Sequence, residues 1–178
     1  WQPDKVRGYL AARAGRARTR VSYEPEILGT GGALRSVRDF LGDGPFWVIS
    51  SDIAAALDPA PLREAFGKGD GLAAVWLEPK KGPRTVERDR RGRITCYRSP
   101  TPCVPGTFTL CGLHLMSPRV FDFLPDRPFC TLVDAYTAAM EAGVFADGVT
   151  VPSSYWADAG TSSAYLRIHA EVKRLAKA

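Results

Sequence analysis

Two aspartates are the residues best placed to do chemistry. Asp52 follows the apolar run 46–49 and two serines, and Asp158 precedes Ala159-Gly160-Thr161 in a segment typical of a tight turn. Open α/β sheets bind ligands beyond the carboxyl ends of their strands, so we expect the sheet to bring the two carboxylates together. Such a pair suits a hard divalent cation such as Mg²⁺, with phosphate oxygens and water completing its octahedron.

Each aspartate also has a structural interpretation. Asp52 could be the N-cap of a short helix over 54–57, because a carboxylate accepts well from the free N–H groups of a first turn. Asp158 could stabilise the turn ahead of the last helix. Read one at a time, the two residues leave both interpretations open.

A glycine-rich run at Gly29-Thr30-Gly31-Gly32 is a second candidate site. Glycine has no Cβ, so the backbone can approach a ligand closely, and at a helix start we expect free N–H groups for an anion. The run is neither a dinucleotide fingerprint, which needs Gly-x-Gly-x-x-Gly after a buried strand, nor a P-loop, which needs Gly-Lys-Ser/Thr. A plain structural turn is the alternative.

Composition sets the class of protein. The chain has 178 residues, of which 45% are hydrophobic and 24% charged, as expected for one globular domain. It has no run of about 18 apolar residues and no signal-peptide pattern, so we expect a cytoplasmic protein without membrane contact. The four cysteines form no Cys-x-x-Cys pair and have no neighbouring histidine, which favours free thiols over zinc.

The remaining reactive or charged residues favour simpler roles. The net charge is +5, and arginines gather at 13–20 and 84–93, including Arg16 and Arg18. Without interleaved aromatic residues or a known motif, these clusters indicate solvated loops and no nucleic-acid partner. His114 and His169 are interpreted as structural. Ser50, Ser51 and the Ser153-Ser154 pair lack a Gly-x-Ser-x-Gly setting for a nucleophile.

Hydrophobic periodicity predicts an α/β domain. Strands alternate with helices over the first half, and the run 46–49 has the pattern of a strand buried on both faces. Glycine-containing segments separate the elements, and Gly143 is the expected C-cap of its helix. The predicted helices are 4–14, 33–41, 58–66, 118–124, 133–143 and 163–178, and the predicted strands are 20–24, 46–49, 71–77, 93–97, 107–116 and 148–152.

Four segments match the motifs of one family in order. Residues 24–34 match Glu-x-x-x-Leu-Gly-Thr-Ala/Gly-Gly-Ala-Leu, and 46–52 match a strand ending in Asn-Gly-Asp. Residues 108–118 match Phe-x-Gly-Ile-x-x-x-x-Pro, and 156–161 match Trp-x-Asp-x-Gly-Thr. Together the segments resemble the sugar nucleotidyltransferases, or nucleoside-diphosphate-sugar pyrophosphorylases, over nearly the whole chain.

The resemblance implies a Rossmann-like, mixed but mostly parallel sheet flanked by helices. It also implies transfer of a nucleoside monophosphate from a nucleoside triphosphate to a sugar 1-phosphate, with release of pyrophosphate and with Mg²⁺ as cofactor. The residues it assigns are Asp52 and Asp158 to catalysis and the metal, Leu28, Gly29, Thr30 and Gly31 to the nucleotide, and Gly112 to the sugar phosphate.

Two departures from the family pattern change the expectations. Nothing before Trp1 supplies the family's opening strand and its glycine-rich loop with Arg and Lys, so we expect 1–178 to be one domain incomplete at its N-terminus and inactive as given. After the hairpin strand, Tyr97-Arg98-Ser99-Pro100 replaces a Lys-Pro, which leaves Arg98 as the candidate phosphate-binding cation. In 50–52, Ser-Ser-Asp replaces Asn-Gly-Asp but keeps the carboxylate.

The leading hypothesis is a sugar-1-phosphate nucleotidyltransferase. It resembles mannose-1-phosphate guanylyltransferases or MurNAc-1-phosphate uridylyltransferases, and its expected partners are a nucleoside triphosphate and a sugar 1-phosphate. A homodimer is one assembly that the sequence leaves open. The alternatives are a catalytically inactive, nucleotide-sugar-binding regulatory domain and a basic nucleic-acid-binding module.

Overall fold

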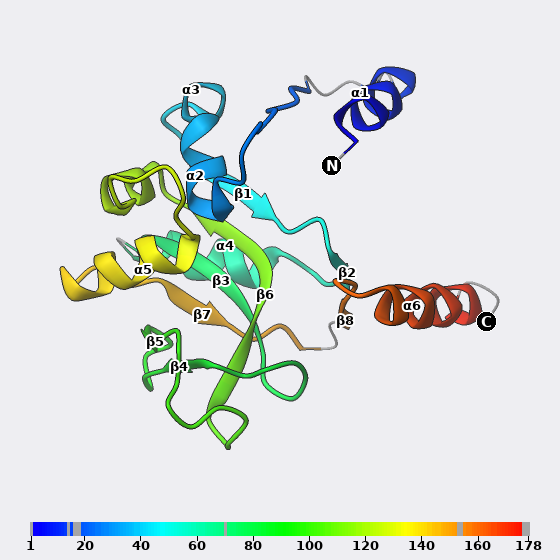
Figure 1. The fold of residues 1–178 in the computed structure, drawn as a ribbon. Coiled ribbons are helices and arrows are strands. Elements are labelled where there is room, and N and C mark those ends of the chain that lie inside the picture. Colours follow the sequence, from blue (N-terminus) through cyan, green and yellow to red (C-terminus); the bar gives the residue numbers. More distant parts are fainter. Residues whose placement is uncertain (1, 14, 16–18, 70, 153–154, 176–178) are drawn as a thin grey trace.

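A six-stranded sheet forms the centre of the computed structural model, which describes residues 2–13, 15, 19–69, 71–152 and 155–175 (Figure 1). The strands follow the order β5-β4-β6-β3-β7, and β1 pairs with β6 off this path. The strands of this sheet are β1 Phe46–Ile49, β3 Ala73–Glu78, β4 Val86–Arg88, β5 Ile94–Cys96, β6 Thr107–Met116 and β7 Asp147–Val149. The helices are α1 Pro3–Ala12, α2 Gly29–Ser36, α3 Arg38–Leu41, α4 Ala60–Gly67, the 3₁₀ helix η1 Pro118–Phe123, α5 Leu132–Glu141 and α6 Ser162–Leu175.

The long strand β6 organises this sheet. It runs antiparallel to β1, β3 and β4, whereas β3 and β7 pair in parallel. Since β1 and β3 both oppose β6, these two strands and β7 point the same way. The predicted α/β fold with a mixed sheet is confirmed. Most strands share one direction, but most hydrogen-bonded pairings of the described strands are antiparallel, because β6 returns between β1 and β3.

Helices cover both faces of the sheet. Successive side chains of a strand point to opposite faces, and in β3 Val75 and Leu77 join a core with α5 and η1, whereas Ala74 and Trp76 join a second core with Leu62 of α4. Both cores include fully buried residues. The predicted strand 71–77 is therefore confirmed as buried on two faces.

Strand β1 differs from its prediction. Trp47 is 37% exposed and Ile49 is 66% exposed, so the expected burial of both faces is wrong. The reason is its position, because among the described strands β1 pairs only with β6 and lies at an edge. The predicted strand 20–24 is also wrong, since its residues form no ladder, and the helix expected from residue 33 begins at Gly29.

A separate two-stranded sheet was missed. β2 (Ile53–Ala56) pairs antiparallel with β8 (Tyr155–Asp158), and Ile53 lies opposite Asp158. The helix over 54–57 that Asp52 was to cap is therefore wrong, and Asp158 ends a strand. Helix α6 follows β8 and extends away from the central sheet (Figure 1). Arg16, Arg18, Ser153-Ser154 and the end of the predicted last helix, 176–178, lie outside the described residues.

Candidate functional site

The β2–β8 pair brings Asp52 and Asp158 together. Asp52 directly precedes β2, and its carbonyl oxygen accepts a 2.7 Å hydrogen bond from the N–H of Ala159. Asp158 Oδ1 accepts from the N–H of Gly160, also at 2.7 Å. A Cβ placed on Gly160 would lie 3.0 Å from Asp158 Oδ1 and 3.9 Å from Asp52 Oδ2, so these two oxygens are at most about 7 Å apart.

Both carboxylates are exposed, and neither forms an ion pair with any side chain in the described ranges. Among those same residues no group of three or more His, Cys, Asp and Glu side chains gathers around one point. A metal ion held here would therefore have two carboxylate ligands from the chain. That donor set fits Mg²⁺, which usually takes one or two carboxylates and completes its shell with phosphate oxygens and water.

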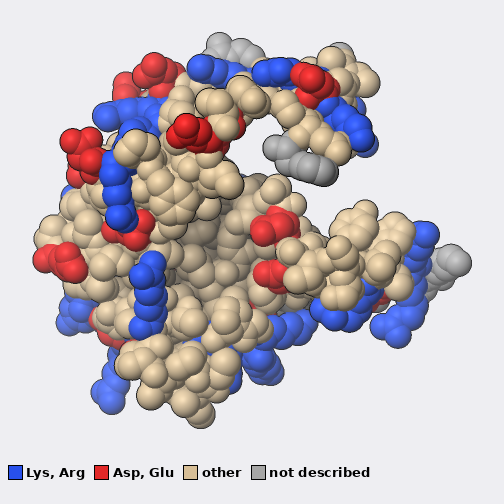
Figure 2. All heavy atoms as spheres, viewed as in Figure 1, with Lys and Arg blue, Asp and Glu red and all other residues tan. Residues whose placement is uncertain are grey.

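A cavity of about 490 Å³ opens beside this pair. Its walls are mainly apolar side chains of α2, β1, β6 and the start of α5, and Figure 2 shows a hollow on this face, between α2 and α6. The volume and the apolar lining are typical of small-molecule sites, in which a few polar groups fix the ligand's orientation. The polar residues that line it are Ser22, Glu24, Thr30, Ser50 and His114.

Gly112 connects the cavity to the carboxylates. It lies where the pairing of β6 with β3 shifts register, with φ +74°, in the left-handed region that favours glycine. Its carbonyl oxygen accepts from the N–H of Ser50 at 2.8 Å, and a Cβ there would lie 2.6 Å from Ser50 Oγ. The bulge in β6 thus holds the 50–52 segment at the rim of the cavity, and Gly112 itself lines the cavity.

The glycine-rich run has a packing role. The N–H groups of Gly31 and Gly32 both donate to the carbonyl oxygen of Cys130, so the expectation that they would be free for an anion is wrong. The run starts α2, whose first turn lies against 128–131, where a Cβ on Gly32 would be 2.4 Å from the carbonyl oxygen of Pro128. Backbone of another segment, rather than a ligand, occupies the space that these glycines leave.

Thr30 is the member of this run that reaches the cavity. Its Oγ1 accepts a 2.9 Å hydrogen bond from the N–H of Leu132, which fixes α2 against the start of α5. Leu28 and Gly29 are half-buried, and the Leu28 carbonyl oxygen accepts from the N–H of Cys130. Of the four residues assigned to the nucleotide, Leu28, Gly29 and Gly31 therefore support the wall from behind.

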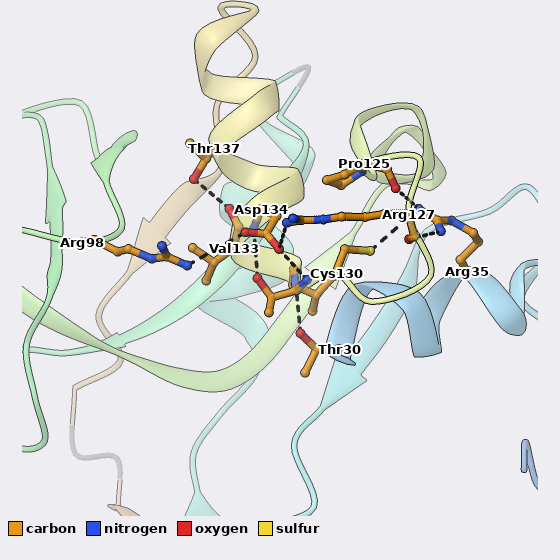
Figure 3. Close-up of polar contacts among 11 residues, drawn as sticks. Thr30, Arg35, Arg98, Pro125, Arg127, Cys130, Val133, Asp134 and Thr137 are labelled. Carbon is orange, nitrogen blue, oxygen red and sulfur yellow. Dashed lines mark hydrogen bonds and ion pairs between the residues drawn. The ribbon is translucent and has the colours of Figure 1, made fainter. Parts of the chain in front are cut away.

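Arg98 lies apart from the cavity, in a smaller hollow of about 330 Å³ that Tyr97 and Asp134 also line. Figure 3 shows Arg98 and Arg127 reaching Asp134 from opposite sides, at N–O distances of 3.9 and 3.2 Å. Asp134 also caps α5 in a capping box with Thr131. The pKa of the Asp134 carboxyl is lowered, mainly by the backbone hydrogen bond from Thr131.

Two residues of the cavity were not assigned from the sequence. Glu24 is half-buried, and its Oε2 lies 3.4 Å from the N–H of Leu28. His114 was interpreted as structural, and it does bond to Tyr136, but it also lines the cavity. Burial lowers the pKa of His114 to about 4, so the imidazole is neutral at pH 7. The signal for Glu24 was its place at the head of the 24–34 motif.

Known proteins similar to this chain are sugar nucleotidyltransferases. The mannose-1-phosphate guanylyltransferase 1 of Arabidopsis thaliana is 28% identical over 152 residues, covering 82% of this chain and 42% of that protein. A low-salt glycan biosynthesis nucleotidyltransferase of Haloferax volcanii is 27% identical over 141 residues, covering 75% of this chain and 39% of that protein. The chain belongs to the sugar nucleotidyltransferase family. It spans about two fifths of the length of these relatives, and no family model matches it.

Solved structures agree on the fold of this sugar nucleotidyltransferase domain. HddC from Yersinia pseudotuberculosis superposes with a TM-score of 0.70 at 15% identity, covering 94% of this chain and 73% of that chain. A UDP-glucose pyrophosphorylase from Acinetobacter baumannii gives 0.63 at 18% identity, covering 92% and 64%. At these identities the likeness concerns the fold alone. None of the helices in the described ranges is long and apolar enough to cross a membrane.

Proposed function

We propose that the protein transfers a nucleoside monophosphate from a nucleoside triphosphate to a sugar 1-phosphate, releasing pyrophosphate. The observation that carries the proposal is the adjacency of an apolar cavity to the Asp52 and Asp158 pair, joined through Ser50 and Gly112. The cavity suits a base or a sugar ring, and the carboxylates suit a cation that neutralises phosphates. The names of the relatives support the same reaction class.

In this proposal an oxygen of the sugar 1-phosphate attacks the α-phosphorus of the triphosphate, and the bond to the β-phosphate breaks. The two anions repel each other, so positioning and charge neutralisation carry most of the catalysis. Asp52 and Asp158 would hold the Mg²⁺, which supplies positive charge for the phosphate oxygens when bound. Arg98 remains the proposed phosphate-binding cation, and its side chain is 79% exposed, so a phosphate can compete with Asp134 for it.

Glu24 favours guanine as the base. Its carboxylate lines the cavity and has one described hydrogen bond, the long one from Leu28. An ionised carboxylate is only an acceptor, and guanine offers two adjacent donors, N1–H and the 2-amino group. Uracil and thymine present one N–H between two carbonyl oxygens, which a carboxylate repels. The guanylyltransferase relatives agree with this preference.

The test is pyrophosphate release by the full-length protein, with four nucleoside triphosphates crossed with a panel of sugar 1-phosphates. We expect GTP to be the preferred donor, Mg²⁺ to be required, and Asp52→Asn and Asp158→Asn to lower turnover at least 100-fold. Asp43→Asn is the matched control, because Asp43 is an exposed carboxylate in the loop between α3 and β1. Undiminished turnover in a folded Asp52 or Asp158 variant would remove that residue from the proposed metal site.

The base preference has its own variant. Glu24→Gln keeps the size of the side chain but replaces one acceptor oxygen with a donor, which meets the guanine donors unfavourably. We expect it to lower kcat/KM for GTP at least 10-fold and to narrow the gap to UTP. An unchanged ratio of GTP to UTP use would show that Glu24 does not read the base.

A further inference from the structure

His114 lies in the middle of β6, with its side chain 3% exposed. Its Nδ1 is 2.9 Å from the hydroxyl oxygen of Tyr136 on α5, and the two rings stack at 5.9 Å. Tyr136 stacks in turn on Tyr97 at 5.3 Å. The imidazole is therefore held from one side by an aromatic stack, while the same residue lines the main cavity.

The Tyr136 hydroxyl decides which ring nitrogen of His114 carries the proton. This hydroxyl is buried, and within the described chain His114 is its hydrogen-bond partner. If Nδ1–H donated to the tyrosine oxygen, the O–H proton would be buried without an acceptor, which is the more costly arrangement. The O–H therefore donates to Nδ1. In a neutral imidazole the remaining proton is then on Nε2.

The Nε2–H group has no acceptor among the described residues. Trp76 Nε1 is the one side-chain nitrogen or oxygen of those residues that is fully buried without a partner. His114 Nε2 is not in that state and has no described hydrogen bond, so it keeps contact with open space. Since His114 lines the cavity, that space is the cavity.

We propose that His114 is a specificity-determining residue whose Nε2–H donates a hydrogen bond to a neutral oxygen of the ligand in the cavity. The proposal rests on the proposed function, which puts a nucleotide or nucleotide sugar there. The acceptor is a base carbonyl or a sugar hydroxyl oxygen, because an uncharged donor among apolar walls compensates a phosphate poorly. The phosphates belong at the rim, beside Asp52 and Asp158.

Two variants separate the two nitrogens of the ring. In His114→Asn the amide oxygen takes the place of Nδ1 and accepts from Tyr136, but nothing replaces Nε2. In His114→Gln the amide nitrogen reaches the place of Nε2 and keeps a donor toward the cavity. Tyr97→Phe is the control, since it keeps the ring stack and does not contact His114.

The experiment measures binding of GTP and GDP-mannose by calorimetry, after thermal unfolding has shown that each variant is folded. We expect His114→Asn to weaken binding by about 3- to 10-fold, as expected for one neutral hydrogen bond, and His114→Gln and Tyr97→Phe to stay within about twofold. A loss for both probes places the acceptor on the base, and a loss for GDP-mannose alone places it on the sugar. Equal binding by wild type and His114→Asn would overturn the proposal.

Nitrogen NMR of the ligand-free protein tests the tautomer independently. With ¹⁵N-labelled histidine, we expect the His114 signals of an Nε2–H tautomer, and an increased share of Nδ1–H in Tyr136→Phe. An Nδ1–H tautomer in the wild type would overturn the inference, whatever the binding. If the wild type binds neither probe, the proposed function fails and takes the ligand assignment with it, while the tautomer still reports on Tyr136.

Discussion

Mild acid should destabilise the protein through His114. Burial lowers the pKa of this imidazole from 6.5 to about 4, whereas the unfolded chain keeps the ordinary value. Above pH 6.5 the residue is neutral in both states and costs nothing. As the pH falls from 6.5 toward 4, the unfolded state binds a proton that the folded state does not, so stability decreases across this window.

The size of the effect follows from the two pKa values. Each pH unit within the window costs about 1.4 kcal/mol, so between pH 7 and pH 5 His114 alone removes about 2 kcal/mol from the free energy of unfolding. Domains of this kind are typically stable by roughly 5–15 kcal/mol. The loss is therefore large enough to measure by urea denaturation.

The assay compares wild type with His114→Asn at pH 7, 6 and 5. Other groups near the imidazole, including Glu24 in the cavity and the neutral Tyr136 and Tyr97, are present in both proteins, so their contributions largely cancel. We expect the wild type to lose about 2 kcal/mol more than the variant between pH 7 and pH 5. Parallel losses would refute the reasoning and show that His114 is protonated, or accessible to water, in the folded state.

Three further predictions concern stability at neutral pH and are measured by the same denaturation. Gly32→Ala would put a Cβ 2.4 Å from the carbonyl oxygen of Pro128, and we expect a loss of about 2–3 kcal/mol. Gly42→Ala has open space but a φ of +71°, so about 1 kcal/mol is expected, and equal losses for the two glycines would contradict the packing role of Gly32. Thr131→Ala removes the capping box of α5 and should cost about 1 kcal/mol, whereas no change would indicate that another group takes over the cap.

Local pattern was sufficient for the elements that carry their own signal. The strand predicted over 107–116 coincides with β6, and the hairpin of β4 and β5 follows its turn at Arg91-Gly92. Gly143 has φ +77° just after α5, as expected of a glycine that ends a helix. These features depend on residues close together in the chain, which is why periodicity and turn chemistry identify them.

The misses have non-local causes. The alanines of β2 favour a helix by propensity, and only pairing with β8, about a hundred residues later, makes them a strand. The N–H groups of Gly31 and Gly32 meet the carbonyl oxygen of Cys130, which no local pattern connects to them. His114 was correctly placed in an apolar strand, but the cavity in front of it exists only after α2 and α5 are packed.

The partner exchange along β6 has a consequence for synthesis of the chain. β1 has no partner in the described sheet except the second half of β6, and β3 pairs with β6 and β7. About 70 residues separate β1 from the end of β6. At 5–20 residues per second, the ribosome takes roughly 4 to 14 s to complete that stretch. During this time the apolar strand 46–49 is translated but unpaired, so the nascent chain should depend on chaperones most strongly before Met116 emerges.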